Sequence, residues 1–234
     1  MARVPDLDRR RALRQAASVS VATGLYGISF GALAVTAGLS TLQAQALSVL
    51  MFTGGSQFAF IGIVGAGGGG LAAAATATLL GARNALYGAV VSPFLQVRGL
   101  RRLAAAHVTI DESTAVSTAQ RDPQTARLGF WWAGLGVFVL WNACTLVGSV
   151  VGDALGDPRR WGLDAAAGAA FLGLLWPRLA ARRAQVVAAG AVVVALALTP
   201  VTPAGVPVLA AAVVAVVVGW RIPAAASRAT VEDT

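Results

Sequence analysis

A single arginine, Arg83, lies near the middle of an apolar run, residues 71–94, that contains no other charged residue. About 20 apolar residues are enough for a helix to cross the hydrocarbon core of a bilayer. An arginine at the centre of such a helix costs roughly 2.5–3.5 kcal/mol on insertion scales, so it usually faces the interior of a helix bundle. The run therefore predicts a transmembrane helix whose arginine needs an anionic partner.

Six further apolar segments accompany this run. The chain is 57% hydrophobic and 12% charged, whereas soluble domains carry about 25% charged residues. We predict an all-α, polytopic membrane protein, in which a basic tail (1–15) and a polar C-terminal tail (222–234) flank one transport domain (16–221). The seven segments are 16–39, 44–66, 71–94, 128–151, 163–176, 186–198 and 206–220.

The arginines between the segments predict their orientation. Tail 1–15 and loop 96–127 both hold arginine clusters, so the positive-inside rule places both in the cytoplasm. Three full crossings cannot join two cytoplasmic ends. The second segment is interrupted at mid-depth by Thr53-Gly54-Gly55-Ser56-Gln57. We therefore expect a broken or re-entrant helix there, since irregular backbone at that depth must line a cavity or be buried in protein.

Several function classes are disfavoured. The net charge is +8, but no basic stripe is interleaved with aromatic residues, so we expect no nucleic-acid partner. The lone Cys144 and the lone His107 make no metal site, and we expect no cofactor. A serine protease would need a base near Ser56, and the one histidine lies in a polar loop. We therefore expect no enzymatic activity.

The interruption in the second segment is the first candidate site. A half-helix that begins there exposes N–H groups that can hold a carboxylate, and the end of the preceding half exposes carbonyls that can hold an ammonium group. An amino-acid zwitterion needs both. The alternative is a glycine packing notch in which Ser56 bonds back to its own helix. The candidate substrate-binding residues are Gly54, Gly55, Ser56 and Gln57.

The third segment supplies the second candidate site. Arg83 and Tyr87 are one helical turn apart, and Asn84 lies beside them. The anion that Arg83 needs is either a substrate carboxylate or an acid of the protein, for which Asp164 is the best internal candidate. Loop 96–127 holds a further pair, Asp111 and Glu112, which could relay protons or lock a gate to an arginine, or simply be a solvated acidic spot.

Small and aromatic residues predict how the helices pack. Glycines at positions 24, 27 and 31 share one helical face, which allows another backbone to approach closely. Most tryptophans lie near the predicted ends of segments, but Trp141 lies mid-span and should pack internally.

These motifs, in this order, resemble the AzlC family, the large subunit of bacterial branched-chain amino acid exporters. The resemblance rests on Gly-Ile-Ser-Phe-Gly (27–31), Phe-Thr-Gly-Gly-Ser-Gln-Phe (52–58), Arg83 with Leu-Tyr-Gly (86–88), Asp-Glu (111–112) and Gly-Leu-Asp (162–164). The family commonly has an asparagine two residues before the arginine and a histidine after it, whereas this chain has Gly81 and Asn84. The resemblance implies a partner, a small membrane subunit of the AzlD type.

The sequence thus predicts a multi-pass secondary transporter of the bacterial inner membrane. The resemblance implies that it exports branched-chain or other small apolar amino acids. No Walker motif for nucleotide is present, so we expect the proton or voltage gradient to drive export. The competing hypotheses are a non-transporting membrane assembly subunit and a passive channel.

Overall fold

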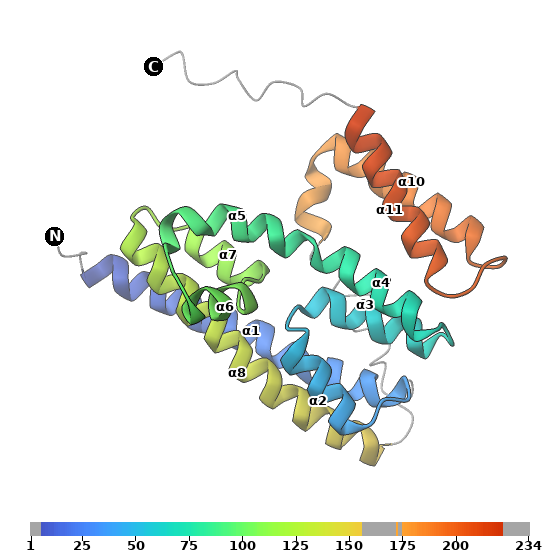
Figure 1. Ribbon diagram of the computed structural model, residues 1–234, viewed down its shortest axis with the longest axis horizontal. Helices are drawn as coiled ribbons and strands as arrows, with labels where there is room; N and C mark the ends of the chain where they lie inside the picture. Colours follow the sequence, from blue (N-terminus) through green and yellow to red (C-terminus); the bar gives the residue numbers. More distant parts are fainter. Residues whose placement is uncertain (1–5, 156–171, 173–174, 222–234) are drawn as a thin grey trace. The chain divides into compact units, whose positions relative to one another are not determined.

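The computed structural model describes residues 6–155, 172 and 175–221 of the chain (Figure 1). Every regular element within those ranges is helical, as predicted. The chain divides into two compact units, Met1–Ala170 and Phe171–Thr234. All predicted site residues belong to the first unit, where Asp164 lies outside the described residues.

Two long helices, α1 (Asp6–Thr36) and α8 (Pro123–Leu155), pack along each other in the first unit. In the described part of the chain, these two are long and apolar enough to cross a membrane. Gly24 faces Leu140, and Gly27 faces Trp141, where a Cβ on Gly27 would lie 2.5 Å from the Trp141 carbonyl oxygen. The predicted glycine face is thus a close-packing surface. Since the paired numbers rise together along both helices, α1 and α8 run parallel.

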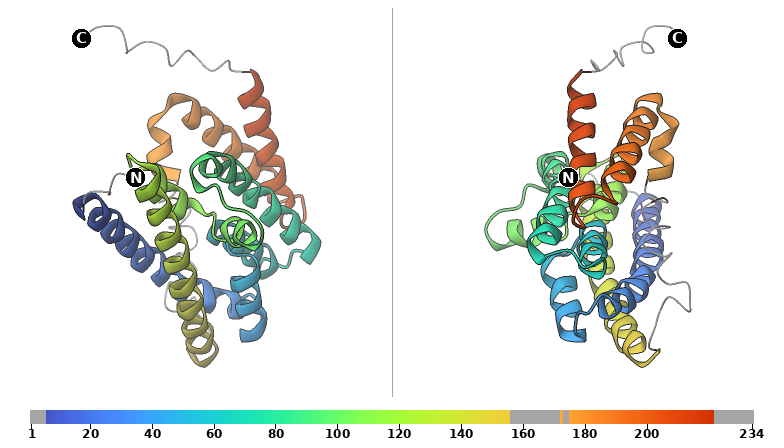
Figure 2. Two further views of the ribbon diagram at one scale, coloured as in Figure 1. Left: turned by 60° about the vertical axis from the view of Figure 1, so that its left-hand side comes forward. Right: turned by 90° about the vertical axis from the view of Figure 1, so that its right-hand side faces the viewer.

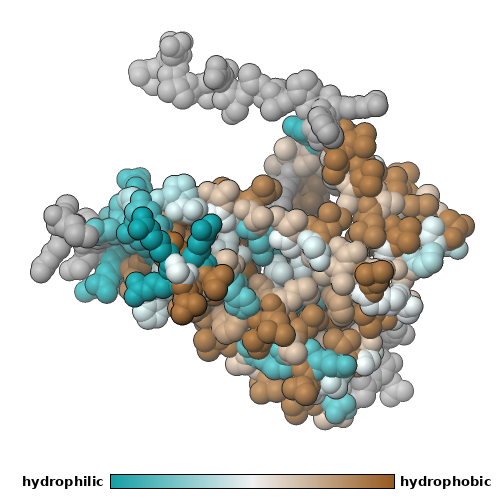
Figure 3. All heavy atoms as spheres, in the orientation of Figure 1, coloured by the Kyte–Doolittle hydropathy of each residue, from teal (hydrophilic) through white to brown (hydrophobic). Residues whose placement is uncertain are grey.

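Both helices therefore begin at the same end of the unit, which we call the arginine-rich end. The side chains of Gln120 and Gln15 form a 3.1 Å hydrogen bond there, and hydrophilic side chains gather over this end in Figure 3. The predicted tail 1–15 differs in one respect, because α1 is already helical from Asp6. Its arginines, alanines, leucines and glutamine are good helix formers, so they extend the helix beyond its apolar part.

The second apolar segment is broken, as predicted, into α2 (Thr41–Leu50) and α3 (Gly54–Gly65). The break lies at residues 51–53, slightly earlier than expected, and residues 54–57 form the first turn of α3. α2 starts a few residues after α1 ends. α3 returns until its last residue lies against Ala37, next to the end of α1. The turn between them reaches midway along α8, where the rings of Phe52 and Phe138 lie 5.0 Å apart. The pair is a re-entrant hairpin with both ends opposite to the arginine-rich end.

The third apolar segment crosses the whole unit but is not one helix, which the sequence analysis did not foresee. It consists of α4 (Gly70–Gly81) and α5 (Arg83–Leu95). α4 runs antiparallel to α3 and ends beside Ser56, and glycine at this end weakens the helix. α5 continues to the arginine-rich end, where Arg127 of α8 donates a hydrogen bond to the Phe94 carbonyl.

Loop 96–127 is not a surface loop, contrary to our expectation. It folds into α6 (Leu100–His107) and α7 (Asp111–Thr118), a second hairpin that enters from the arginine-rich end. Its tip reaches the first hairpin, where the rings of Phe52 and His107 lie 6.0 Å apart. Apolar side chains such as Val108 pack in a buried cluster with α5 and α8. Serine and threonine hydroxyls of α7 bond back to nearby carbonyls, so the helix can be buried despite its polar composition.

This path resolves the conflict in the arginine count. α1 leads away from the arginine-rich end, the α2–α3 hairpin turns back without crossing, and the α4–α5 pair returns. The two arginine clusters therefore lie at one end, as the positive-inside rule requires of two cytoplasmic regions. The expectation of a broken second segment is confirmed, and its two halves form a hairpin.

The second unit contains the short 3-10 helix η2 (Trp176–Ala180), α10 (Arg182–Leu198) and α11 (Val206–Arg221). α10 and α11 lie side by side in both views of Figure 2, with Gly190 against Val214. Most of the fifth predicted segment, 163–176, lies outside the described residues. The number of seven crossing segments therefore stays a prediction.

Candidate functional site

Three helices begin where the two hairpin tips meet. α3 starts at Gly54, α5 at Arg83 and α7 at Asp111. The first N–H groups of a helix have no partner within it and carry a partial positive charge. The ends of α2, α4 and α6 lie at the same place, and their carbonyls carry the opposite partial charge. The guanidinium of Arg83 is the full positive charge in this region that can hold an anion.

The anion that occupies this region is the Asp111 carboxylate. The Nη2 atom of Arg83 donates to Oδ2 of Asp111 at 2.7 Å, and the Tyr87 hydroxyl donates to Oδ1 at 2.7 Å. The Arg83 and Asp111 side chains are only 25% and 23% exposed. On its other side Arg83 lies against Gly55, where a Cβ would come within 2.9 Å of Nη2. The site thus joins the tip of each hairpin to the break in the third segment.

The protein acid that contacts Arg83 is Asp111, whereas the sequence analysis had favoured Asp164, which lies outside the described residues. The sequence analysis placed Asp111 in loop 96–127 and left open a proton relay, a pairing with an arginine and a solvated position. The α6–α7 hairpin carries it to Arg83. Its neighbour Glu112 points to a different helix, where it accepts a 3.4 Å hydrogen bond from the Thr23 hydroxyl of α1. The two acids therefore have different partners and are not one carboxylate pair.

Gln57 has a structural role that the sequence analysis did not assign. Its side chain is fully buried, and Nε2 donates to the carbonyls of Met51 at 2.8 Å and Ser48 at 3.3 Å. Its Oε1 accepts a 2.9 Å hydrogen bond from Nε1 of Trp141. The amide thus ties the end of α2 and the start of α3 to α8, and both of its N–H groups are engaged within the protein. Trp141 packs internally, as predicted, with its ring against Gly54.

Other polar atoms at the same place have no partner in the described structure. These buried atoms are the hydroxyl oxygen of Ser56, Nε of Arg83 and Oδ1 of Asn84. Ser56 itself is fully buried and lies against Gly81, at the end of α4. Buried polar atoms nearly always have a hydrogen-bond partner. Unpaired atoms on both sides of the ion pair mark a place that a small polar ligand would complete.

Sequence reasoning missed two residues at the tips, Phe52 and His107. Their rings lie in contact, and His107 also contacts Phe138 of α8, with ring centroids 5.6 Å apart. A signal for the second hairpin was present in the alanine-rich and hydroxyl-rich composition of 104–118, in which Asp111 and Glu112 are the charged residues. Such a segment can be buried in a helix bundle once its few charges are paired.

Comparisons with known proteins agree with the motif resemblance. The model of a family described as AzlC protein matches residues 18–155, which is more than half of the chain. A protein of Archaeoglobus fulgidus, described as an uncharacterized membrane protein, is 32% identical over 195 residues. That match covers 82% of this chain and 85% of the archaeal one. No solved structure matches. The family match spans both hairpins and the Arg83–Asp111 pair. The chain therefore belongs to the AzlC family of membrane proteins.

Proposed function

We propose that this protein is a secondary transporter that exports branched-chain or other small apolar amino acids across the bacterial inner membrane. The observation that carries this proposal is the Arg83–Asp111 ion pair at the meeting point of two opposed hairpins. The proton or voltage gradient supplies the energy, and a small membrane subunit of the AzlD type is the partner in the bilayer.

An amino-acid zwitterion matches the charges of this pair. Its carboxylate replaces Asp111 beside Arg83 and the N–H groups that begin α3, and its ammonium group binds the Asp111 carboxylate. The exchange replaces one ion pair by two, so no unpaired charge is left in a water-poor environment. The unpaired Ser56 hydroxyl and Asn84 amide oxygen supply further hydrogen bonds.

The surroundings favour a small, apolar side chain. Gly55 lies against Arg83, and Gly81 faces Ser56, so the neighbouring helices approach the charged groups closely and leave little room. Phe52, Phe58 and Trp141 are buried and add apolar walls nearby.

The opposed hairpins offer a route for alternating access. One hairpin enters from the arginine-rich end and the other from the opposite end, and their tips touch beside the site. Transporters commonly bind substrate at mid-depth between interrupted helices and open one side at a time. When a zwitterion separates Asp111 from Arg83, the α6–α7 hairpin loses its main polar link to α5 and can move.

The test is export of valine and leucine from cells loaded with the corresponding dipeptides, with and without the AzlD-type partner. Wild type should export, and Arg83→Ala should lose export at least about tenfold, as expected for removing roughly 1.4 kcal/mol or more of substrate interaction. Arg102→Ala, which removes an exposed arginine of α6, is the matched control and should export normally.

The alternatives give different results in the same system. In vesicles, counterflow should accelerate labelled valine uptake when unlabelled valine is inside. A passive channel would show flux without this acceleration, and an assembly subunit would show no flux with any partner. Normal export by Arg83→Ala would show that the proposed site is wrong.

A further inference from the structure

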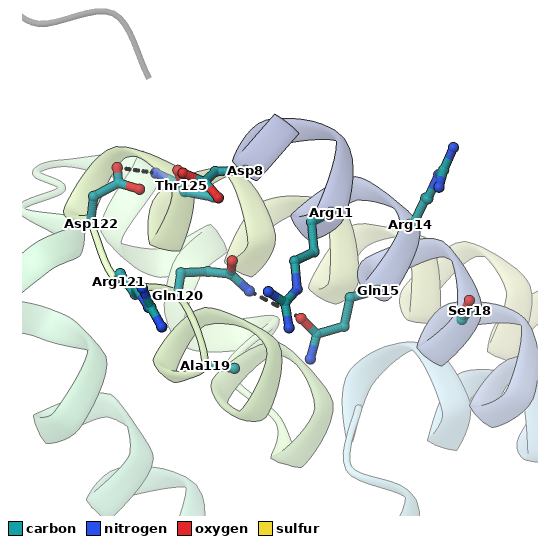
Figure 4. Close-up of a pocket in the computed structure, with 10 residues that line it drawn as sticks. All are labelled: Asp8, Arg11, Arg14, Gln15, Ser18, Ala119, Gln120, Arg121, Asp122 and Thr125. Atoms are coloured by element: carbon teal, nitrogen blue, oxygen red, sulfur yellow. Dashed lines mark hydrogen bonds between the residues drawn. The ribbon is translucent and has the colours of Figure 1, made fainter. Parts of the chain in front are cut away.

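A second polar pocket lies at the arginine-rich end, beyond the C-terminal end of α7 (Figure 4). It has a volume of about 650 Å³ and lies between the first turns of α1 and the connection from α7 to α8. One bond that joins the two sides is the hydrogen bond between Gln120 and Gln15, 3.1 Å long. None of the predicted site residues lines this pocket.

Three arginines and two aspartates line the pocket, so its wall carries an excess of positive charge. Arg11 and Arg14 of α1 and Arg121 of the α7–α8 connection line it, and none of them forms an ion pair with a described residue. Figure 4 shows the Arg11 side chain reaching toward Gln120, whereas Arg14 points away. Of the two aspartates in the wall, Asp122 is engaged in capping α8.

Asp122 caps the N-terminus of α8 with its side chain. Its Oδ1 accepts the backbone N–H groups of Gln124 at 3.0 Å and Thr125 at 2.9 Å. A carboxylate that caps a helix start is already stabilised by that helix. Asp8, the other aspartate in the wall, forms no ion pair with Arg11 or Arg121. These two arginines come from segments more than a hundred residues apart, and both face the pocket without a direct ion-pair partner among the described residues.

We propose that this pocket binds the phosphate headgroup of an anionic phospholipid. It lies where the apolar part of α1 begins, next to Ser18, which is the depth at which headgroups meet a membrane protein. Guanidinium groups bind phosphate oxygens in a planar, two-point geometry. Basic pockets at the cytoplasmic level of helix bundles recognise anionic headgroups. A volume of about 650 Å³ holds a glycerophosphate group, including its glycerol oxygens beside Gln15 and Gln120.

A lipid bound here stabilises the base of the α6–α7 hairpin. The phosphate would bridge α1 to the connection that follows α7, and the other end of α7 holds Asp111. Binding should therefore stabilise the folded protein, because a ligand that binds only the native state raises its stability by mass action.

The test compares purified protein in nanodiscs of phosphatidylcholine with nanodiscs that also contain phosphatidylglycerol. The thermal unfolding midpoint of the wild type should rise by about 4 °C or more with phosphatidylglycerol, a shift of the size expected for one bound ligand in a chain of this length. Arg11→Gln/Arg121→Gln should lose most of that rise. The control Arg10→Gln/Arg98→Gln removes the same charge outside the pocket and should keep it.

Two results would overturn the proposal. One is an equal response of the pocket variant and the control, which would mean a general effect of surface charge. The other is an equal rise with 10 mM inorganic phosphate in phosphatidylcholine nanodiscs, which would mean that a soluble anion is the ligand. If the pocket variant does not fold, a photoreactive phosphatidylglycerol should label residues 8–18 and 119–125 of the wild type, and even labelling of all arginine clusters would refute the site.

Discussion

The Arg83–Asp111 ion pair should contribute measurably to stability, independently of any transport assay. The variants are Arg83→Gln, Asp111→Asn and the double variant, which nearly preserve side-chain size. Hydrogen bonds between charged groups contribute about 1.5–3 kcal/mol, and removing one partner of a fully buried pair costs roughly 3–5 kcal/mol. Each side chain here is about a quarter exposed, so water screens part of the interaction. We expect each single variant to lose about 2–3 kcal/mol.

The double variant should lose much less than the sum of the single losses. The expected coupling energy is about 1.5–3 kcal/mol, since either single variant leaves the other charge without its partner. The assay is reversible unfolding in detergent, followed by circular dichroism, with Arg102→Gln as a control for removing an exposed charge. A coupling energy below about 0.5 kcal/mol would mean that positions 83 and 111 are independent, and it would refute a direct contact between Arg83 and Asp111.

Three further outcomes follow from the packing and the chain path. Gln57→Ala should cost roughly 2–3 kcal/mol in the same unfolding assay, because the Ser48 carbonyl and the Trp141 indole N–H lose their amide partner in a buried place. The Met51 carbonyl keeps the Thr53 N–H, and an unchanged midpoint would contradict a role of Gln57 in the hairpin turn. Gly27→Val should greatly reduce the folded yield in membranes, because its side chain would clash with the Trp141 backbone of α8. Gly62→Ala, whose added Cβ meets nothing within 4 Å, should keep the normal yield. Equal yields of the two variants would rule out the close α1–α8 packing. In a background without the native cysteine, cysteines at Gly69 and Gln124 should react with an impermeant maleimide from opposite sides of the membrane, and reaction from one side would exclude the proposed path.

Several features of the fold could be predicted from local sequence because the physical cause is itself local. Adjacent glycines weaken a helix wherever they occur, so a break beside Gly54 and Gly55 was visible in the chain, and the structure places it just before them. A face of glycines spaced three and four apart can only serve close packing in a helix, and α1 uses it in that way against α8. The central arginine pointed to an anionic partner because an isolated charge is costly at that depth.

The sequence could not identify Asp111 as the partner of Arg83, because that contact forms only when segment 96–127 is buried among the helices of the first unit. Segment 96–127 reads as a surface loop by its arginines and acids. Its small hydroxyl side chains satisfy themselves with their own backbone once helical, and its few apolar residues then pack with α5 and α8. Whether segment 96–127 is buried or solvated depends on the free energy of these contacts relative to that of hydration, and the packing of the whole unit determines those contacts.

Gln57 illustrates the same limit at the level of one side chain. A polar residue beside a helix break either binds substrate or forms hydrogen bonds that stabilise the turn, and both roles have the same sequence pattern. In the structure the amide stabilises the turn, because Nε1 of Trp141, far along the chain, lies 2.9 Å from Oε1 of Gln57. Only the packing of α8 against the hairpin distinguishes these possibilities.

The sequence by itself determined that this is a helical membrane protein with an interrupted second segment and an arginine in the middle of its third apolar segment, since those properties follow from hydropathy, charge and glycine content along short stretches. The tertiary structure alone decided which residues meet that arginine. Parallel packing of α1 and α8 brings both arginine-rich regions to one end, and the two hairpins then bring Gly55, Arg83 and Asp111 together. Contacts between distant segments depend on how all the helices of the unit pack together, and a short stretch of sequence does not determine that packing.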